Sequence, residues 1–150
     1  MNFSHLLVPI DFSAPSVRAL RLAVKLARHG RARITVVHVV APPVAPLAAD
    51  ISGWAALDTD LMIRYQAEIE GNAAHQLRRV AGEEIPEDVT WSTLVRPGTI
   101  EEVILEATKE IGADLIVIGT VGRTGLPHLL LGSVTERVVA RASVPVLVTH

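Results

Sequence analysis

The chain contains 150 residues, the size of one domain, and 49% of them are apolar, which excludes an intrinsically disordered chain. The 14 basic and 16 acidic residues leave a formal charge of −2, and only 3% of residues are aromatic, so neither a basic nucleic-acid-binding surface nor a base-stacking platform is expected. The absence of cysteine excludes disulfides, thiolate zinc sites and cysteine nucleophiles.

No segment has the pattern of a membrane span or a secretory signal. The longest uncharged stretch, Ile34 to Ala49, is interrupted by Pro42, Pro43 and Pro46, and a strand-like run begins almost at the first residue. We therefore expect a single cytoplasmic domain covering residues 1–150, with no insertion into a membrane.

Short β-branched runs alternate with longer helical patterns along the chain. Near-continuous apolar runs of strand length are typical of strands buried on both faces of a parallel sheet. The predicted strands are His5–Ile10, Ala32–Val40, Asp88–Val95, Ala113–Ile118 and Val144–Thr149.

Between these strands, apolar residues recur every three to four positions, as expected of helices with one buried face. The first helix is predicted over Ser13–His29. A long second helix is predicted to bury one series of residues: Met62, Tyr65, Ile69, Ala73, Leu77 and Val80. Two further helices, Thr99–Ile111 and Ser133–Ala142, each begin with the spacing of a capping box. The alternation predicts an α/β fold, an open five-stranded parallel sheet with helices on both faces.

In such a sheet, ligands bind beyond the carboxyl ends of the strands, where the strand order reverses. The segment after the first strand, Pro9 to Ser13, contains no glycine, so the dinucleotide-binding fingerprint GxGxxG is missing there. No GxxxxGK[ST] sequence occurs in the chain, which excludes a P-loop. The glycines instead follow the fourth strand, in the pattern Gly119-x2-Gly122-x9-Gly132-Ser133.

This glycine pattern has two interpretations. Each glycine alone suits a turn, and Ser133 alone suits a helix N-cap. Taken together, glycines at one strand end let backbone N–H groups approach an anion, and Gly132-Ser133 lies where a helix begins. Unpaired N–H groups and the helix dipole favour a phosphate at such a position. The combination therefore favours phosphate binding over turns alone.

The same pattern resembles the ATP-binding motif of the universal stress protein family. The resemblance extends to LLVPIDFS near the amino terminus, to VVHVV in the second predicted strand, and to the whole segment from Gly112 to His150. It covers essentially the whole chain, although residues 41–90 are not diagnostic. It implies a Rossmann-like strand order of 3-2-1-4-5, which would place the ends of the first and fourth strands side by side.

The resemblance also implies a nucleotide site, residue by residue. The positions that would line the adenine and ribose are Pro9, Ile10, Asp11, Val39, Ile118 and Gly119. The positions that would hold the phosphates are Gly122, Arg123, Gly132, Ser133, Val134 and Thr135. Asp11 would lie near the ribose and phosphates and is the expected contact for a Mg²⁺ ion bound through them.

Three functions follow from the resemblance. The first is an ATP-binding stress-response module that forms a homodimer through Val144–Thr149 and signals its nucleotide state to a regulatory protein partner. The second is a slow Mg²⁺-dependent ATPase, and the third is an interaction module whose site is empty or holds AMP. ADP would fit the same pocket. We assign no catalytic residue, because the sequence offers no convincing general base for hydrolysis.

Two other features have simpler interpretations. Arg18, Arg21, Lys25 and Arg28 form one stripe on the first predicted helix, which suits a solvated face better than a partner or nucleic-acid site. His38 lies within an apolar strand and is expected to be a hydrogen-bonded core residue rather than a metal ligand.

Overall fold

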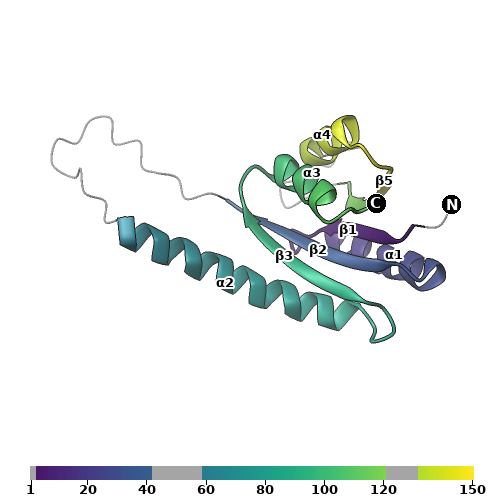
Figure 1. Cartoon of the computed structure of the whole chain (residues 1–150), viewed down its shortest axis with the longest axis horizontal. Helices are drawn as coiled ribbons and strands as arrows, with labels where there is room; N and C mark the ends of the chain where they lie inside the picture. The colour runs from purple at the N-terminus through teal and green to yellow at the C-terminus, as the bar shows by residue number, and fades with distance from the viewer. Residues whose placement is uncertain (1–2, 42–58, 121–131) are drawn as a thin grey trace.

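The computed structural model of the chain describes residues 3–41, 59–120 and 132–150 (Figure 1). Its strands are β1 (His5–Pro9), β2 (Arg33–Val40), β3 (Trp91–Pro97), β4 (Leu115–Gly119) and β5 (Val146–Thr149). Its helices are α1 (Ala14–Gly30), α2 (Thr59–Glu84), α3 (Ile100–Glu110) and α4 (Ser133–Arg141). The strands pair in parallel in the order β3-β2-β1-β4-β5. The predicted α/β fold and strand order are confirmed.

The two faces of the sheet carry two separate cores. Helices α1 and α2 pack on one face, and α3 and α4 pack on the other (Figure 1). Successive side chains of a strand point to opposite faces. Leu6 and Val8 of β1 therefore join the core under α1 and α2, and Leu7 between them joins the core under α3 and α4. A helix on each face explains why β1 is apolar without alternation.

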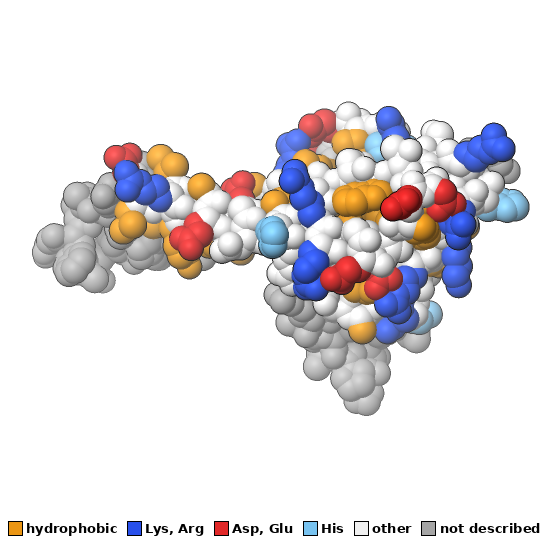
Figure 2. Space-filling model, turned by 90° about the horizontal axis from the view of Figure 1, so that it is seen from below, with side chains coloured by type: hydrophobic (Ala, Val, Ile, Leu, Met, Phe, Trp, Pro, Cys, Tyr) orange, Lys and Arg blue, Asp and Glu red, His pale blue; other side chains and the backbone are white. Residues whose placement is uncertain are grey.

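Helix α2 is longer than the sheet it covers. Its 26 residues span about 39 Å, whereas the 7 residues of β3 span about 23 Å. Ala73 and Leu77 lie in the core, but Tyr65 is 58% exposed, and Leu61 and Ile63 are also exposed. The prediction of a buried face along the whole helix is therefore wrong for its first turns, which extend beyond the strands (Figure 1) and form an arm that stands out from the main body (Figure 2). No helix in the described ranges, α2 included, is both long and apolar enough to cross a membrane.

The ends of β3, α3 and α4 differ in detail from the prediction. β3 begins at Trp91 rather than Asp88, because the Val89 N–H donates to the Pro86 carbonyl at 3.1 Å and closes a turn there. Thr99 is the N-cap of α3, as predicted, but its side chain makes no capping hydrogen bond. The N-cap of α4 is Gly132 rather than Ser133, and no side chain in the described ranges caps this helix. The capping boxes expected at both helices are therefore not formed.

The basic stripe of α1 faces solvent, as predicted. The Arg21 and Arg28 side chains are 60% and 58% exposed, and they form ion pairs with Glu84 at 2.7 Å and Asp88 at 2.8 Å. Exposed pairs of this kind contribute little to stability. The stripe is a solvated face that meets the end of α2 and the turn that follows it.

Candidate functional site

The carboxyl ends of β1, β2 and β4 lie next to one another. β1 is the central strand, with β2 on one side and β4 on the other. From β1 the chain adds β2 and then β3 on one side of the sheet, and it then adds β4 and β5 on the other side. The strand order therefore reverses between β1 and β4. This is the position where an open α/β sheet leaves a crevice for a ligand.

The turn after β1 presents the Asp11 carboxylate at the entrance to α1. Asp11 Oδ1 accepts a hydrogen bond from the Ser13 N–H at 3.0 Å and another from the Ser13 hydroxyl. Phe12, between them, has a φ of +65°, in the left-handed region. The carboxylate is therefore part of a tightly folded turn rather than a swinging side chain.

The start of α1 is already capped and offers little to a phosphate. The Ser13 side chain accepts a hydrogen bond from the Ser16 N–H, and Pro15 in the first turn has no N–H to donate. Although α1 follows β1 at the switch point, its amino end therefore offers an anion fewer N–H donors than a helix start without these two features.

The start of α4 has the opposite character. Its N-cap is Gly132, in an extended conformation with φ −69° and ψ 152°, and no side chain among the described residues caps it. The N–H groups of Ser133, Val134 and Thr135, in the first turn, have no carbonyl partner within the helix. Together with the helix dipole, these donors favour a negative group at this end.

Two hydrogen bonds fasten the start of α4 to the end of β4. The Thr135 hydroxyl donates to the Gly119 carbonyl at 2.8 Å, and the Gly132 N–H donates to the Thr120 carbonyl at 2.5 Å. Thr135 is 4% exposed, and its hydroxyl proton is engaged with Gly119. Its side chain therefore holds β4 and α4 together, while its backbone N–H belongs to the first turn of α4.

Gly119 has a steric role as well. A Cβ at this position would lie 3.0 Å from both the backbone carbon and the oxygen of Pro15. A side chain here would therefore push the start of α1 away from the end of β4, and glycine lets the two approach closely without strain. The close approach brings the end of β4 against the first turn of α1.

Val39 lies two residues beyond Val37, the last residue of β2 that pairs with β1. The Val37 carbonyl accepts from the Ile10 N–H at 2.8 Å, on the β1 side. Alternate residues of a strand direct their N–H and C=O groups to the same side, so those of Val39 also point towards β1. Because β1 ends at Pro9, the Val39 groups face the space beyond it.

The predicted site residues assemble at one edge of the sheet as far as the structure describes them. Gly122 and Arg123 lie outside the described residues, and the others lie at the ends of β1, β2 and β4 and the start of α4. The side chains of Ile10 and Ile118 are buried in the two cores, at 3% and 5% exposure. These two residues can offer a ligand backbone groups but little side-chain surface.

One contact at the site was not anticipated from the sequence. The Phe12 and His38 rings lie with their centroids 4.5 Å apart, at an interplanar angle of 39°. The His38 Nδ1 also lies 2.6 Å from the Ile10 carbonyl oxygen, which confirms the predicted hydrogen-bonded histidine, although its side chain is half-buried. No local pattern signals that residues 12 and 38 stack, because the contact joins the ends of two different strands.

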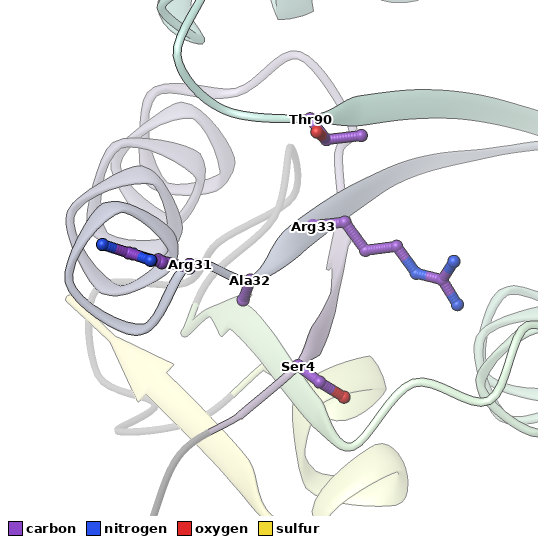
Figure 3. Close-up of a pocket in the computed structure, with 5 residues that line it drawn as sticks. All are labelled: Ser4, Arg31, Ala32, Arg33 and Thr90. Atoms are coloured by element: carbon purple, nitrogen blue, oxygen red, sulfur yellow. The ribbon is translucent and has the colours of Figure 1, made fainter.

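The described residues contain no group of three or more His, Cys, Asp or Glu side chains that could hold a metal ion. A surface pocket of about 360 Å³ lies at the opposite, amino-terminal edge of the strands, lined by Ser4, Arg31, Ala32, Arg33 and Thr90 (Figure 3). The Arg31 and Arg33 side chains point away from each other, so they do not form a joint anion site.

A family model matches nearly the whole chain, over residues 2–150, and its description is universal stress protein family. The chain belongs to the universal stress protein family. This universal stress protein is 32% identical to Universal stress protein MJ0531 of Methanocaldococcus jannaschii over 151 residues, covering 97% of this chain and 81% of that protein.

Solved structures of similar proteins share the fold. The hypothetical protein MJ0577 has a TM-score of 0.80 to this universal stress protein at 23% identity, covering 99% of this chain and 96% of that one. The universal stress protein of Archaeoglobus fulgidus, solved in complex with dAMP, has a TM-score of 0.57 at 23% identity and covers 99% and 98% of the two chains. At these identities the similarity concerns the fold alone.

Proposed function

We propose that this universal stress protein binds an adenine nucleotide, with ATP as the expected ligand, across the carboxyl ends of β1 and β4. In this proposal it acts in the cytoplasm as a binding module that reports its nucleotide state to a protein partner. The observation that carries the proposal is the start of α4, which no side chain among the described residues caps and which hydrogen bonds hold against the end of β4. Membership of the family and the dAMP complex of a structural neighbour support the ligand class.

The phosphates belong at the start of α4. The first-turn N–H groups of Ser133 to Thr135 and the positive end of the helix dipole would stabilise their charge. The chain has a net charge of −2, so this local arrangement, rather than an overall positive field, would attract the anion. Gly122 and Arg123 are proposed to add contacts to the same phosphates.

The base belongs beside Val39. A backbone N–H and C=O that point in the same direction match the acceptor N1 and the donor N6 amino group on one edge of adenine. Guanine presents the reverse order, an acceptor O6 and a donor N1–H. Pro9, Ile10, Ile118 and Gly119 would then flank the base and ribose from β1 and β4.

Asp11 supplies a carboxylate on the β1 side of the proposed site, in the turn that enters α1. Mg²⁺ prefers oxygen ligands and is usually bound by one or two carboxylates together with substrate phosphates. Asp11 fits this pattern as a single carboxylate ligand, with the nucleotide providing most of the others. The residues present therefore suit a metal that arrives with the nucleotide.

The binding test is calorimetric titration with ATP, ADP, AMP and GTP in the presence of Mg²⁺. We expect adenine nucleotides to bind more tightly than GTP, and Gly132→Val to weaken ATP binding because its side chain obstructs the approach to α4. The extended backbone at Gly132 accepts a valine, so the variant is expected to fold. Gly71→Val, at an exposed position of α2 with open space around it, is the matched control.

Unchanged ATP affinity in folded Gly132→Val would contradict the proposed phosphate position. A wild-type protein that binds no adenine nucleotide would favour the interaction module instead. If the wild type releases phosphate from ATP and Asp11→Ala does not, the protein is a slow ATPase rather than a binding module.

We further propose a homodimer through the edge strand β5, within the segment Val144–Thr149. β5 pairs with β4 on one side only, among the strands described. The carbonyls of Pro145 and Thr149 accept from β4, so the alternating Val148 directs its N–H to the outer edge. An apolar edge left unpaired is an aggregation liability, which favours a partner there.

Val148→Pro would remove an outward N–H without removing a donor to β4. We expect the wild type to run as a dimer and Val148→Pro as a monomer in size-exclusion chromatography with light scattering. Ser143→Pro, just before the strand, is the control, because Ala142 already has the extended backbone that a following proline requires. A monomeric wild type would contradict the dimer.

A further inference from the structure

A single side chain of β2, His38, contacts the residues on both sides of Asp11. The His38 Nδ1 lies 2.6 Å from the carbonyl oxygen of Ile10, and because a carbonyl only accepts, Nδ1 carries the proton and donates. The ring of the same histidine stacks at 4.5 Å against Phe12. The residue before Asp11 and the residue after it are therefore both held by His38.

The hydrogen bond to Ile10 continues the sheet where β1 leaves it. The Ile10 N–H donates to the Val37 carbonyl at 2.8 Å, as in a regular parallel ladder. The Ile10 carbonyl is taken by the His38 side chain. Both polar groups of Ile10 are thus fixed by β2, which sets the direction in which the chain enters the turn.

The ring contact acts on a strained residue. Phe12 has a φ of +65°, a region that bulky side chains occupy only where their surroundings hold them. Phe12 also packs against the core under α1 and α2. The contact with the His38 ring adds to this packing, and so it stabilises a backbone conformation that phenylalanine does not adopt by preference.

The Asp11 carboxylate depends on that conformation. Its Oδ1 accepts from the Ser13 N–H at 3.0 Å and from the Ser13 hydroxyl, across the left-handed Phe12. If Phe12 relaxed to a negative φ, Ser13 would move relative to Asp11 and the two hydrogen bonds would break. The place of the carboxylate at the crevice is therefore coupled to the His38 contacts.

We propose that His38 is a positioning residue for nucleotide binding, which holds the turn around Asp11 in its binding conformation before the ligand arrives. This inference rests on the proposed function. A preformed turn spares the ligand the entropy of ordering it, so losing His38 weakens binding without removing a group that touches the nucleotide.

Three variants separate the parts of this arrangement. His38→Leu removes both the donor and the aromatic ring. His38→Asn keeps an N–H donor close to the place of Nδ1 but loses the ring, and Phe12→Leu keeps the hydrogen bond but loses the stack. His75→Leu, at an exposed histidine of α2, is the matched control.

Two measurements are made on each variant, at a temperature where urea titration shows it folded. The first is amide hydrogen exchange of Ser13 in the ligand-free protein, because its N–H is protected by Asp11. The second is the dissociation constant for ATP with Mg²⁺. We expect His38→Leu to speed Ser13 exchange and to weaken ATP binding roughly tenfold, with His38→Asn and Phe12→Leu in between and His75→Leu unchanged.

Unchanged exchange and unchanged affinity in folded His38→Leu would overturn the inference. Faster Ser13 exchange with unchanged ATP affinity would also overturn it, because the turn would then have no part in binding. If His38→Leu does not fold, His38→Asn and Phe12→Leu decide by the same criteria. A wild-type protein that binds no nucleotide would refute the proposed function and the ligand role of His38, whereas Ser13 exchange would still show whether His38 orders the turn.

Discussion

Replacing Thr135 by valine tests the fastening of α4 to β4. Valine has nearly the volume of threonine but no hydroxyl, so the substitution removes the 2.8 Å hydrogen bond to the Gly119 carbonyl and little else. Thr135 is only 4% exposed, and water cannot readily replace its hydroxyl. Leaving the Gly119 carbonyl without this partner costs about 1–3 kcal/mol, and the added methyl group returns about 0.8 kcal/mol.

The expected net loss is therefore about 0.2–2.2 kcal/mol of unfolding free energy, or up to about 9 °C in Tm for a chain of this length. Urea denaturation followed by circular dichroism measures it. We also expect weaker ATP binding, because the N–H groups at the start of α4 would be held less firmly. Thr135→Ser keeps the hydroxyl and should restore most of the affinity.

Thr108→Val is the matched control. Thr108 is 3% exposed, and its hydroxyl donates to the Ile104 carbonyl at 2.7 Å, within α3. That carbonyl also accepts the regular helical hydrogen bond, so it keeps a partner when the hydroxyl is removed. If Thr135→Val loses no more stability than Thr108→Val, the reasoning about the Gly119 carbonyl is refuted.

Three further predictions follow. Gly119→Ala should lower stability by about 1–3 kcal/mol in urea denaturation, because its Cβ would meet the Pro15 backbone at 3.0 Å, whereas Gly71→Ala in open space should not destabilise. Burial, with a smaller effect of the nearby Arg33, holds the pKa of His5 below 6.5. As the pH drops below 6.5, the unfolded chain gains a proton that the folded protein does not, so the free energy of unfolding should fall. An unfolding free energy that stays constant between pH 7.5 and 5.5 would disprove this. Burial acts to raise the pKa of Asp114, but the hydroxyl and backbone N–H groups that donate to it outweigh burial and lower the pKa below 3.8. Its stabilising contribution should be present above that value and disappear at lower pH, and Asp114→Asn should remove this acid dependence in the same measurement.

The order of elements was accessible from the sequence because it depends on local patterns. Apolar runs such as those around Leu7 and Ile116 have the length of buried strands, and helical periodicity appears between them. The glycines after the fourth strand could be recognised for a similar reason, since they are close together in the chain. The strand order itself came from the family resemblance, because hydrophobic patterns do not specify which parallel strands are neighbours.

Contacts between distant segments were not accessible in this way. Tyr65 has the correct helical spacing for a buried residue, but whether it is buried depends on where the sheet ends. Thr135 has the position of a phosphate ligand in the family motif, but its hydroxyl is donated to Gly119. The spacing of apolar residues along a helix or strand shows which residues share a face, but it does not show which part of the chain packs against that face.

The sequence by itself determined the α/β class, the position of the glycines behind the fourth strand, and the absence of a dinucleotide fingerprint after the first. Only the tertiary structure decided that a side chain caps α1 whereas none among the described residues caps α4. It also decided that Gly119 lies close against Pro15, and that His38 contacts the residues on both sides of Asp11. The physical reason is the sequence separation of the interacting residues. Periodicity and turn chemistry act over a few residues, whereas a ligand site at a sheet edge is formed by strand ends that only the folded sheet brings together.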